Sequence, residues 1–72
     1  MQQSQQTSVS NTYYNLVSVL YHALETAQTS AAYIQDAQQS GNQQLVQFFQ
    51  SVQQTANQQA QQAQQLLAQS SR

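Results

Sequence analysis

Residues 12–40, TYYNLVSVLYHALETAQTSAAYIQDAQQS, decide the fold of this chain. Their apolar residues recur in alternating steps of four and three, at Tyr13, Val17, Leu20, Leu24, Ala27, Ala31 and Ile34. This spacing places them along one face of an α-helix, at the a and d positions of a heptad. Further apolar residues widen the face on both flanks, at Leu16, Ala23 and Ala37 and at Tyr14 and Tyr21. A face of this width favours a globular bundle over a thin two-stranded coiled coil.

The only glycine of the chain, Gly41, follows the last periodic residue of this segment. Glycine is the residue that most often ends a helix in the left-handed conformation. Asn42 can cap a second helix, as Ser10, Asn11 or Thr12 can cap the first. The sequence therefore predicts a turn at 41–42, and a link this short makes the two helices antiparallel neighbours.

The second periodic segment repeats the same alternation of steps. Its stripe consists of Leu45, Phe49, Val52, Ala56, Gln59, Ala63 and Leu66, with Val46, Phe48, Ala60 and Leu67 beside it. Gln59 is the one polar residue on this stripe, where it either tunes the register or lies at the edge of the helix contact. We expect one helical-hairpin domain over residues 10–72, with helices over about 11–40 and 43–69. Residues 1–9 form a Gln/Ser-rich tail that we expect to be flexible, as are the last three residues.

A single hairpin of this size buries little apolar surface. The chain has 18 large apolar side chains and nine alanines, and two helices alone leave much of that surface in water. Domains this small usually need an additional source of stability. The predicted fold class is therefore all-α, an antiparallel helical hairpin that dimerises into a four-helix bundle. The broader apolar surface of the first helix, with all four tyrosines, predicts that it makes more of the subunit contact.

Charged residues are almost absent. Ordinary chains contain about 25% Asp, Glu, Lys and Arg, whereas only Glu25, Asp36 and Arg72 are present here. A chain without lysine and with one arginine cannot neutralise rows of phosphates, which argues against nucleic acid and anionic lipid as partners. Without cysteine there is no disulfide, thiolate nucleophile or Cys-based zinc site.

Membrane insertion and secretion are also not expected. The chain has no 18-residue apolar run. Its first ten residues, MQQSQQTSVS, lack the basic and apolar regions of a signal peptide, so the expected location is the cytoplasm of a recombinant host.

Glutamine occupies 21 positions, mostly those where bundle helices carry Glu, Lys and Arg. We interpret this pattern as deliberate replacement of charged residues by uncharged ones on a heptad frame. The predicted function is that of an engineered, nearly uncharged four-helix-bundle protein that tests folding and solubility without ion pairs. The alternatives are a natural Gln-rich self-association or coiled-coil module and a ferritin-like bundle that binds iron or zinc.

The frame YYNLVSVLYHALETA, followed by YIQDAQQSGNQQLVQFFQSVQQ and AQQLL, resembles small bacterial ferritin-like helical hairpins over about residues 12–67. The resemblance implies a hairpin that pairs into a four-helix bundle. Ferritin-like relatives hold a di-iron site with bridging glutamates and a Glu-x-x-His motif. Only Glu25 matches the glutamate of the first helix, whereas Gln53, Gln54 and Asn57 occupy the corresponding region of the second. These departures argue against metal chemistry.

His22 and Glu25 lie three positions apart, so their side chains can meet on one helix. Doubled by a dimer axis, the pair would supply two His and two Glu to a metal such as iron or zinc. The helical wheel instead places both on the outer face, which favours a solvated or hydrogen-bonded pair. A third possibility is a subunit contact, because Tyr14, Tyr21, Glu25 and Ala32 form a secondary stripe that a partner helix could cover.

The remaining polar residues show no catalytic arrangement. Asp36 lies in the last predicted turn of its helix, where the dipole disfavours a negative charge, so it either makes a useful contact or was left in place. Arg72 is interpreted as a remnant of the expression vector. No acid is placed to orient a Ser–His pair. We expect no enzyme activity, no catalytic, cofactor-binding or metal-binding residue, no small-molecule substrate, and no partner except a second copy of the chain.

Overall fold

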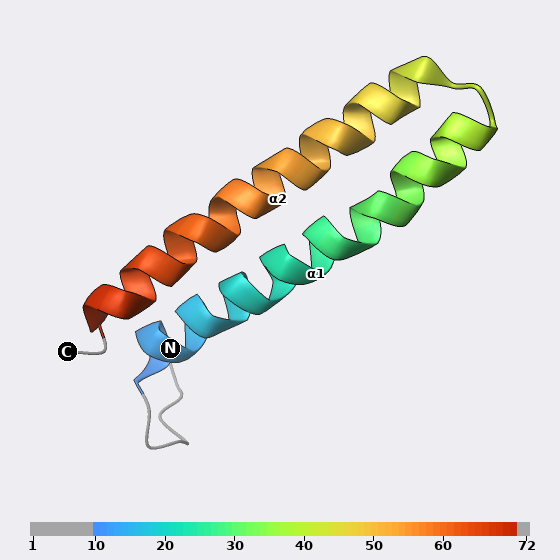
Figure 1. Ribbon diagram of the computed structural model, residues 1–72. Helices are drawn as coiled ribbons and strands as arrows, with labels where there is room; N and C mark the ends of the chain where they lie inside the picture. Colours follow the sequence, from blue (N-terminus) through green and yellow to red (C-terminus); the bar gives the residue numbers. More distant parts are fainter. Residues whose placement is uncertain (1–9, 71–72) are drawn as a thin grey trace.

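The computed structural model describes residues 10–70, and these form two helices that pack against each other as an antiparallel hairpin (Figure 1). Helix α1 spans Asn11–Gln39 and helix α2 spans Gln43–Ser70. No strand occurs in this part of the chain. The predicted all-helical hairpin is thus confirmed. The tail expected over residues 1–9 and the terminal Arg72 lie outside the described residues.

The turn is held by backbone hydrogen bonds at the end of α1. Gly41 has a φ of 74°, in the left-handed region. Its N–H donates to the carbonyl of Gln38 at 3.1 Å, and the N–H of Asn42 donates to that of Ala37 at 3.1 Å. This is the Schellman arrangement, which satisfies two carbonyls that the helix leaves free. The side chain of Asn42 then accepts from the N–H of Leu45 at 3.1 Å and caps α2.

Neutral hydroxyl groups satisfy other polar atoms of the helices. The Ser10 hydroxyl accepts from the N–H of Tyr13 at 3.2 Å and caps α1. Along the helices, the hydroxyls of Ser18, Thr29 and Ser51 each donate to a carbonyl three or four residues earlier in the same helix. These side chains therefore find hydrogen-bond partners in the backbone and use no charged side chain.

The contact between the helices, here called the inter-helix seam, contains part of each predicted stripe together with the residues on one of its flanks. Its buried and half-buried residues are Leu16, Leu20, Ala23, Ala27, Ser30, Ile34 and Ala37 on α1, and Val46, Phe49, Gln53, Ala56, Ala60, Ala63 and Leu67 on α2. The predicted stripe residues Tyr13, Val17, Leu24, Leu45 and Leu66 are exposed. Small residues allow two helices to approach closely, so alanines occupy the centre of the seam and larger side chains are left at its margins. The prediction was wrong for these exposed residues, because the apolar face is wider than one helix contact. It was right for the stripe residues that lie on the seam, namely Leu20, Ala27, Ile34, Phe49, Ala56 and Ala63.

Two polar residues lie on the seam, and neither is the predicted Gln59, which is exposed. Ser30 is completely buried, and its hydroxyl donates to the Thr26 carbonyl at 2.6 Å. The Gln53 amide donates to the Ala27 carbonyl at 3.0 Å, across from α2 to α1. Each buried polar side chain is thereby hydrogen-bonded, as a low-dielectric contact requires.

The hairpin is one helix thick. Its extents are 49 × 23 × 15 Å, and its radius of gyration is 16.1 Å. A compact chain of this length has a radius of gyration of about 11 Å. Within residues 10–70, no third element covers the layer formed by the two helices, so each helix exposes both of its flanks.

Candidate functional site

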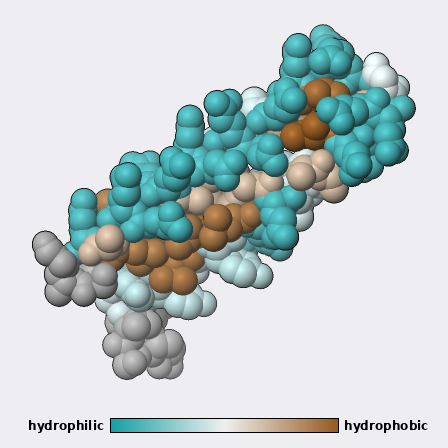
Figure 2. Space-filling view, in the orientation of Figure 1, coloured by the Kyte–Doolittle hydropathy of each residue, from teal (hydrophilic) through white to brown (hydrophobic). Residues whose placement is uncertain are grey.

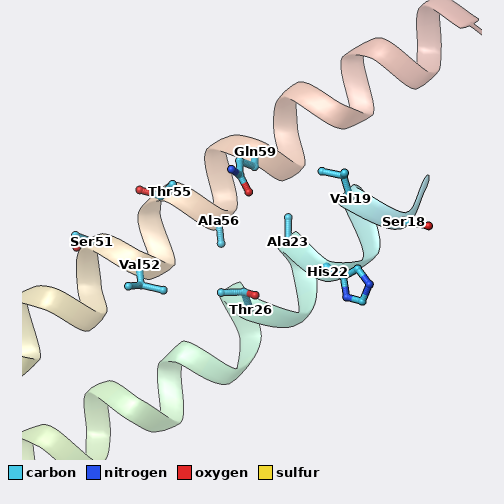
Figure 3. Close-up of a pocket in the computed structure, with 10 residues that line it drawn as sticks. All are labelled: Ser18, Val19, His22, Ala23, Thr26, Ser51, Val52, Thr55, Ala56 and Gln59. Carbon is cyan, nitrogen blue, oxygen red and sulfur yellow. The ribbon is translucent and has the colours of Figure 1, made fainter. Parts of the chain in front are cut away.

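A groove of about 640 Å³ opens between the helices near the middle of the hairpin (Figure 3). Ten residues line it: Ser18, Val19, His22, Ala23 and Thr26 from α1, and Ser51, Val52, Thr55, Ala56 and Gln59 from α2. Ala23 and Ala56 point toward each other from the two helices at its floor, and both are buried. The space exists because alanines on the seam are flanked by other short side chains, which do not reach across the gap between the helices.

Large apolar side chains continue the surface on either side of this groove. A smaller hollow of about 230 Å³ extends it toward the open end of the hairpin, between Leu16, Val19 and Leu66 among others. Val19, Val52 and Leu66 line these two hollows. Tyr33 lies two turns after Thr26, and Leu45 and Phe48 lie two turns before Val52 and Thr55, so helical spacing places them on the same side of the hairpin. We call the combined surface the groove face, and its apolar members are Val19, Tyr33, Leu45, Phe48, Val52 and Leu66. Phe48 is 58% exposed and Val19 is 50% exposed. Both helices contribute to this face.

A second apolar surface, here called the α1 stripe, consists of Tyr13, Tyr14, Val17, Tyr21 and Leu24, all exposed. It lies on the opposite flank of α1, because residues two positions apart, such as Val17 and Val19, are about 200° apart around a helix. Figure 2 shows an apolar band on the α1 side of one face, bordered by hydrophilic side chains on the α2 side. By helical spacing, the exposed Gln50 and Asn57 lie on this flank of α2, one turn before and after Gln53.

His22 and Glu25 are brought together as their spacing predicts. The His22 Nδ1 and Glu25 Oε1 atoms are 3.7 Å apart, and the side chains are 72% and 57% exposed. The His22 ring also meets the edge of Tyr21 with centroids 5.4 Å apart. An exposed pair at this distance is a weak contact, and His22 is the member that lines the groove.

A metal would need more ligands than this pair supplies. Within residues 10–70, no three His, Cys, Asp or Glu side chains gather in one place, whereas zinc sites use four ligands and catalytic ones at least three from the protein. Asp36 is exposed in the last turn of α1, away from the seam. In the described part of the chain, neither helix has a stretch both long and apolar enough to cross a bilayer.

The sequence did not single out the groove. It depends on which flank of each apolar stripe turns toward the other helix, and the heptad spacing alone does not determine that choice. The short side chains at Ala23, Thr26, Thr55 and Ala56 were its only signal.

Comparison with protein-family models, with curated proteins and with solved structures found no match to the chain. The ferritin-like resemblance therefore stays a prediction that rests on the residues quoted above.

Proposed function

We propose that this chain is an engineered, nearly uncharged helical-bundle protein, built to test folding and solubility without ion pairs, and that it works as a homodimeric four-helix bundle. The observation that carries the proposal is a capped, packed hairpin whose exposed polar positions are almost all Gln, Asn, Ser or Thr. Only two charged side chains, Glu25 and Asp36, occur in its helices. The proposal assigns the chain no substrate and no cofactor.

The energetics of folding allow such a protein. Surface ion pairs contribute about 0–1 kcal/mol each, so their removal costs little, whereas burial of apolar surface supplies the main driving force. Removing charges also removes like-charge repulsion along the helices. Helix caps and the turn here rely on neutral groups, at Ser10, Gly41 and Asn42.

Pairing of two chains follows from what the hairpin leaves exposed. Within residues 10–70, the buried apolar residues are six alanines and one valine, whereas ten large apolar side chains are exposed. Because the free energy of burial scales with apolar area, an alanine core of this size supplies little of it. A second copy would cover part of the exposed set and make a second layer.

The solution mass, measured by sedimentation equilibrium at several concentrations together with circular dichroism, tests the proposal. We expect a helical dimer with a cooperative thermal transition. A coil-like spectrum, or a stable monomer at all concentrations, would contradict it. Stoichiometric iron or zinc in the purified protein, lost in His22→Ala, would instead support a metal-binding bundle.

A further inference from the structure

The two faces of the hairpin differ in a way that selects one of them for pairing. Each hairpin of a four-helix bundle presents both of its helices to the other hairpin. The partner surface must therefore be apolar on both helices. The groove face has this property, because Val19 and Tyr33 come from α1 while Leu45, Phe48 and Leu66 come from α2.

The α1 stripe lacks this property. Its apolar residues all belong to α1, and the neighbouring flank of α2 presents exposed amides such as Gln50 and Asn57. A second hairpin laid over this flank would bury those amides against apolar groups, and each unpaired amide would cost free energy. Gln53, also on this flank, already uses its amide in the bond to the Ala27 carbonyl.

From these observations we propose that a second copy of this chain docks on the groove face, so that two such faces form the core of the dimer. The inference rests on the proposed self-association and specifies its surface. The contact is isologous, with the same residues on both subunits.

The shape and area of the groove face suit this occupant. Small residues leave the middle hollow, while Phe48 and Tyr33 stand toward the turn and Leu66 toward the open end. Their exposed parts, with those of Val19, Leu45 and Val52, amount to about 500 Å² of apolar area per chain. A stable interface covers about 800 Å² per partner, so apolar contacts supply more than half of it, and the polar rim can supply the rest.

Apart from His22, the polar residues that line the groove are neutral. Ser18, Thr26, Ser51, Thr55 and Gln59 are neutral groups that both donate and accept hydrogen bonds. The same groups on the second copy can pair with them without like-charge repulsion. His22 and Glu25 lie at the edge, where solvent reaches both side chains.

Two double variants with matched exposure test the assignment by sedimentation equilibrium. The groove variant is Phe48→Gln with Val19→Gln, and the control is Tyr21→Gln with Val17→Gln on the α1 stripe, where Tyr21 is 64% and Val17 40% exposed. Glutamine keeps the helix propensity and adds no charge. The dimer dissociation constant should rise about 100-fold or more in the groove variant and less than about threefold in the control.

A distance measurement covers the case in which a variant fails to fold. The chain has no cysteine, so Thr55→Cys and Gln28→Cys each accept one nitroxide label in an otherwise unchanged sequence. Thr55 lines the groove, and helices pack 8–10 Å apart, so labels at Thr55 in the two copies should lie within about 25 Å of each other. Gln28 lies one turn after Leu24, on the side of the α1 stripe. Labels at Gln28 should therefore be farther apart than those at Thr55.

Three outcomes would overturn the assignment. A dimer that survives in the groove variant but dissociates in the control places the contact on the α1 stripe, with self-association intact. A shorter distance between Gln28 labels than between Thr55 labels likewise places the contact on the α1 stripe. A wild-type protein that stays monomeric while an apolar dye binds in the groove would identify the groove as a small-molecule site, and the proposed dimer would fail with it.

Discussion

Replacing Gly41 with alanine isolates the contribution of the turn that joins the helices. The backbone at Gly41 has a φ of 74°, and a Cβ built there meets no atom within 4 Å. The whole cost therefore comes from the left-handed backbone, which disfavours an L-residue by about 1–2 kcal/mol. We expect Gly41→Ala to lower the free energy of unfolding by this amount per chain, measured by urea denaturation at fixed protein concentration.

The mirror-image residue provides the matched control. The chain is short enough for chemical synthesis, and D-alanine at position 41 favours the same φ. It also restricts the unfolded chain, so we expect the free energy of unfolding to rise by about 0.4–1 kcal/mol. Equal stabilities of the L- and D-alanine proteins would refute the reasoning, because they would show that the left-handed turn is not formed in solution.

Three further substitutions test the seam and the cap, each by urea or thermal unfolding. Ala27→Leu overpacks the buried seam and should lower the free energy of unfolding by about 1–3 kcal/mol. Its control is Ala31→Leu, on the exposed side of α1, which should change the free energy of unfolding by less than about 0.5 kcal/mol. Equal effects of the two substitutions would argue for the stripe predicted from the sequence. Asn42→Ala removes the cap of α2 and should cost about 1 kcal/mol, with Gln43→Ala as the unaffected neighbour. Gln53→Leu should stabilise by about 1 kcal/mol, since it extends the apolar seam and leaves no backbone group unpaired; a loss would show that the amide sets the register.

Much of the fold follows directly from local features of the sequence. Alternating steps of four and three predict two helices, and Gly41 and Asn42 place the turn between them. These features are local, because capping and helix propensity depend on residues within a few positions. The antiparallel packing then follows from the shortness of the link.

The flank of each helix that faces the other helix could not be predicted in the same way. Apolar residues cover more than one flank of α1, so Val17 and Leu24 looked equivalent to Leu16 and Ala23. The deciding quantity is how closely the backbones approach, which depends on the pairing of small residues across both helices, such as Ala23 with Ala56. The groove arises from that pairing, so no single segment encodes it.

The central claim is that apolar contacts stabilise this protein without help from ionic attraction, and the salt dependence of its stability tests that most directly. Between about 0.01 M and 1 M NaCl the screening length falls from about 30 Å to 3 Å. At fixed protein concentration, the free energy of unfolding should change by less than about 0.5 kcal/mol over this range, since the one contact between a histidine and a carboxylate in residues 10–70, His22–Glu25, is exposed. A loss of several kcal/mol as salt is added would contradict the account, because it would mean that the few remaining charges hold the hairpin together.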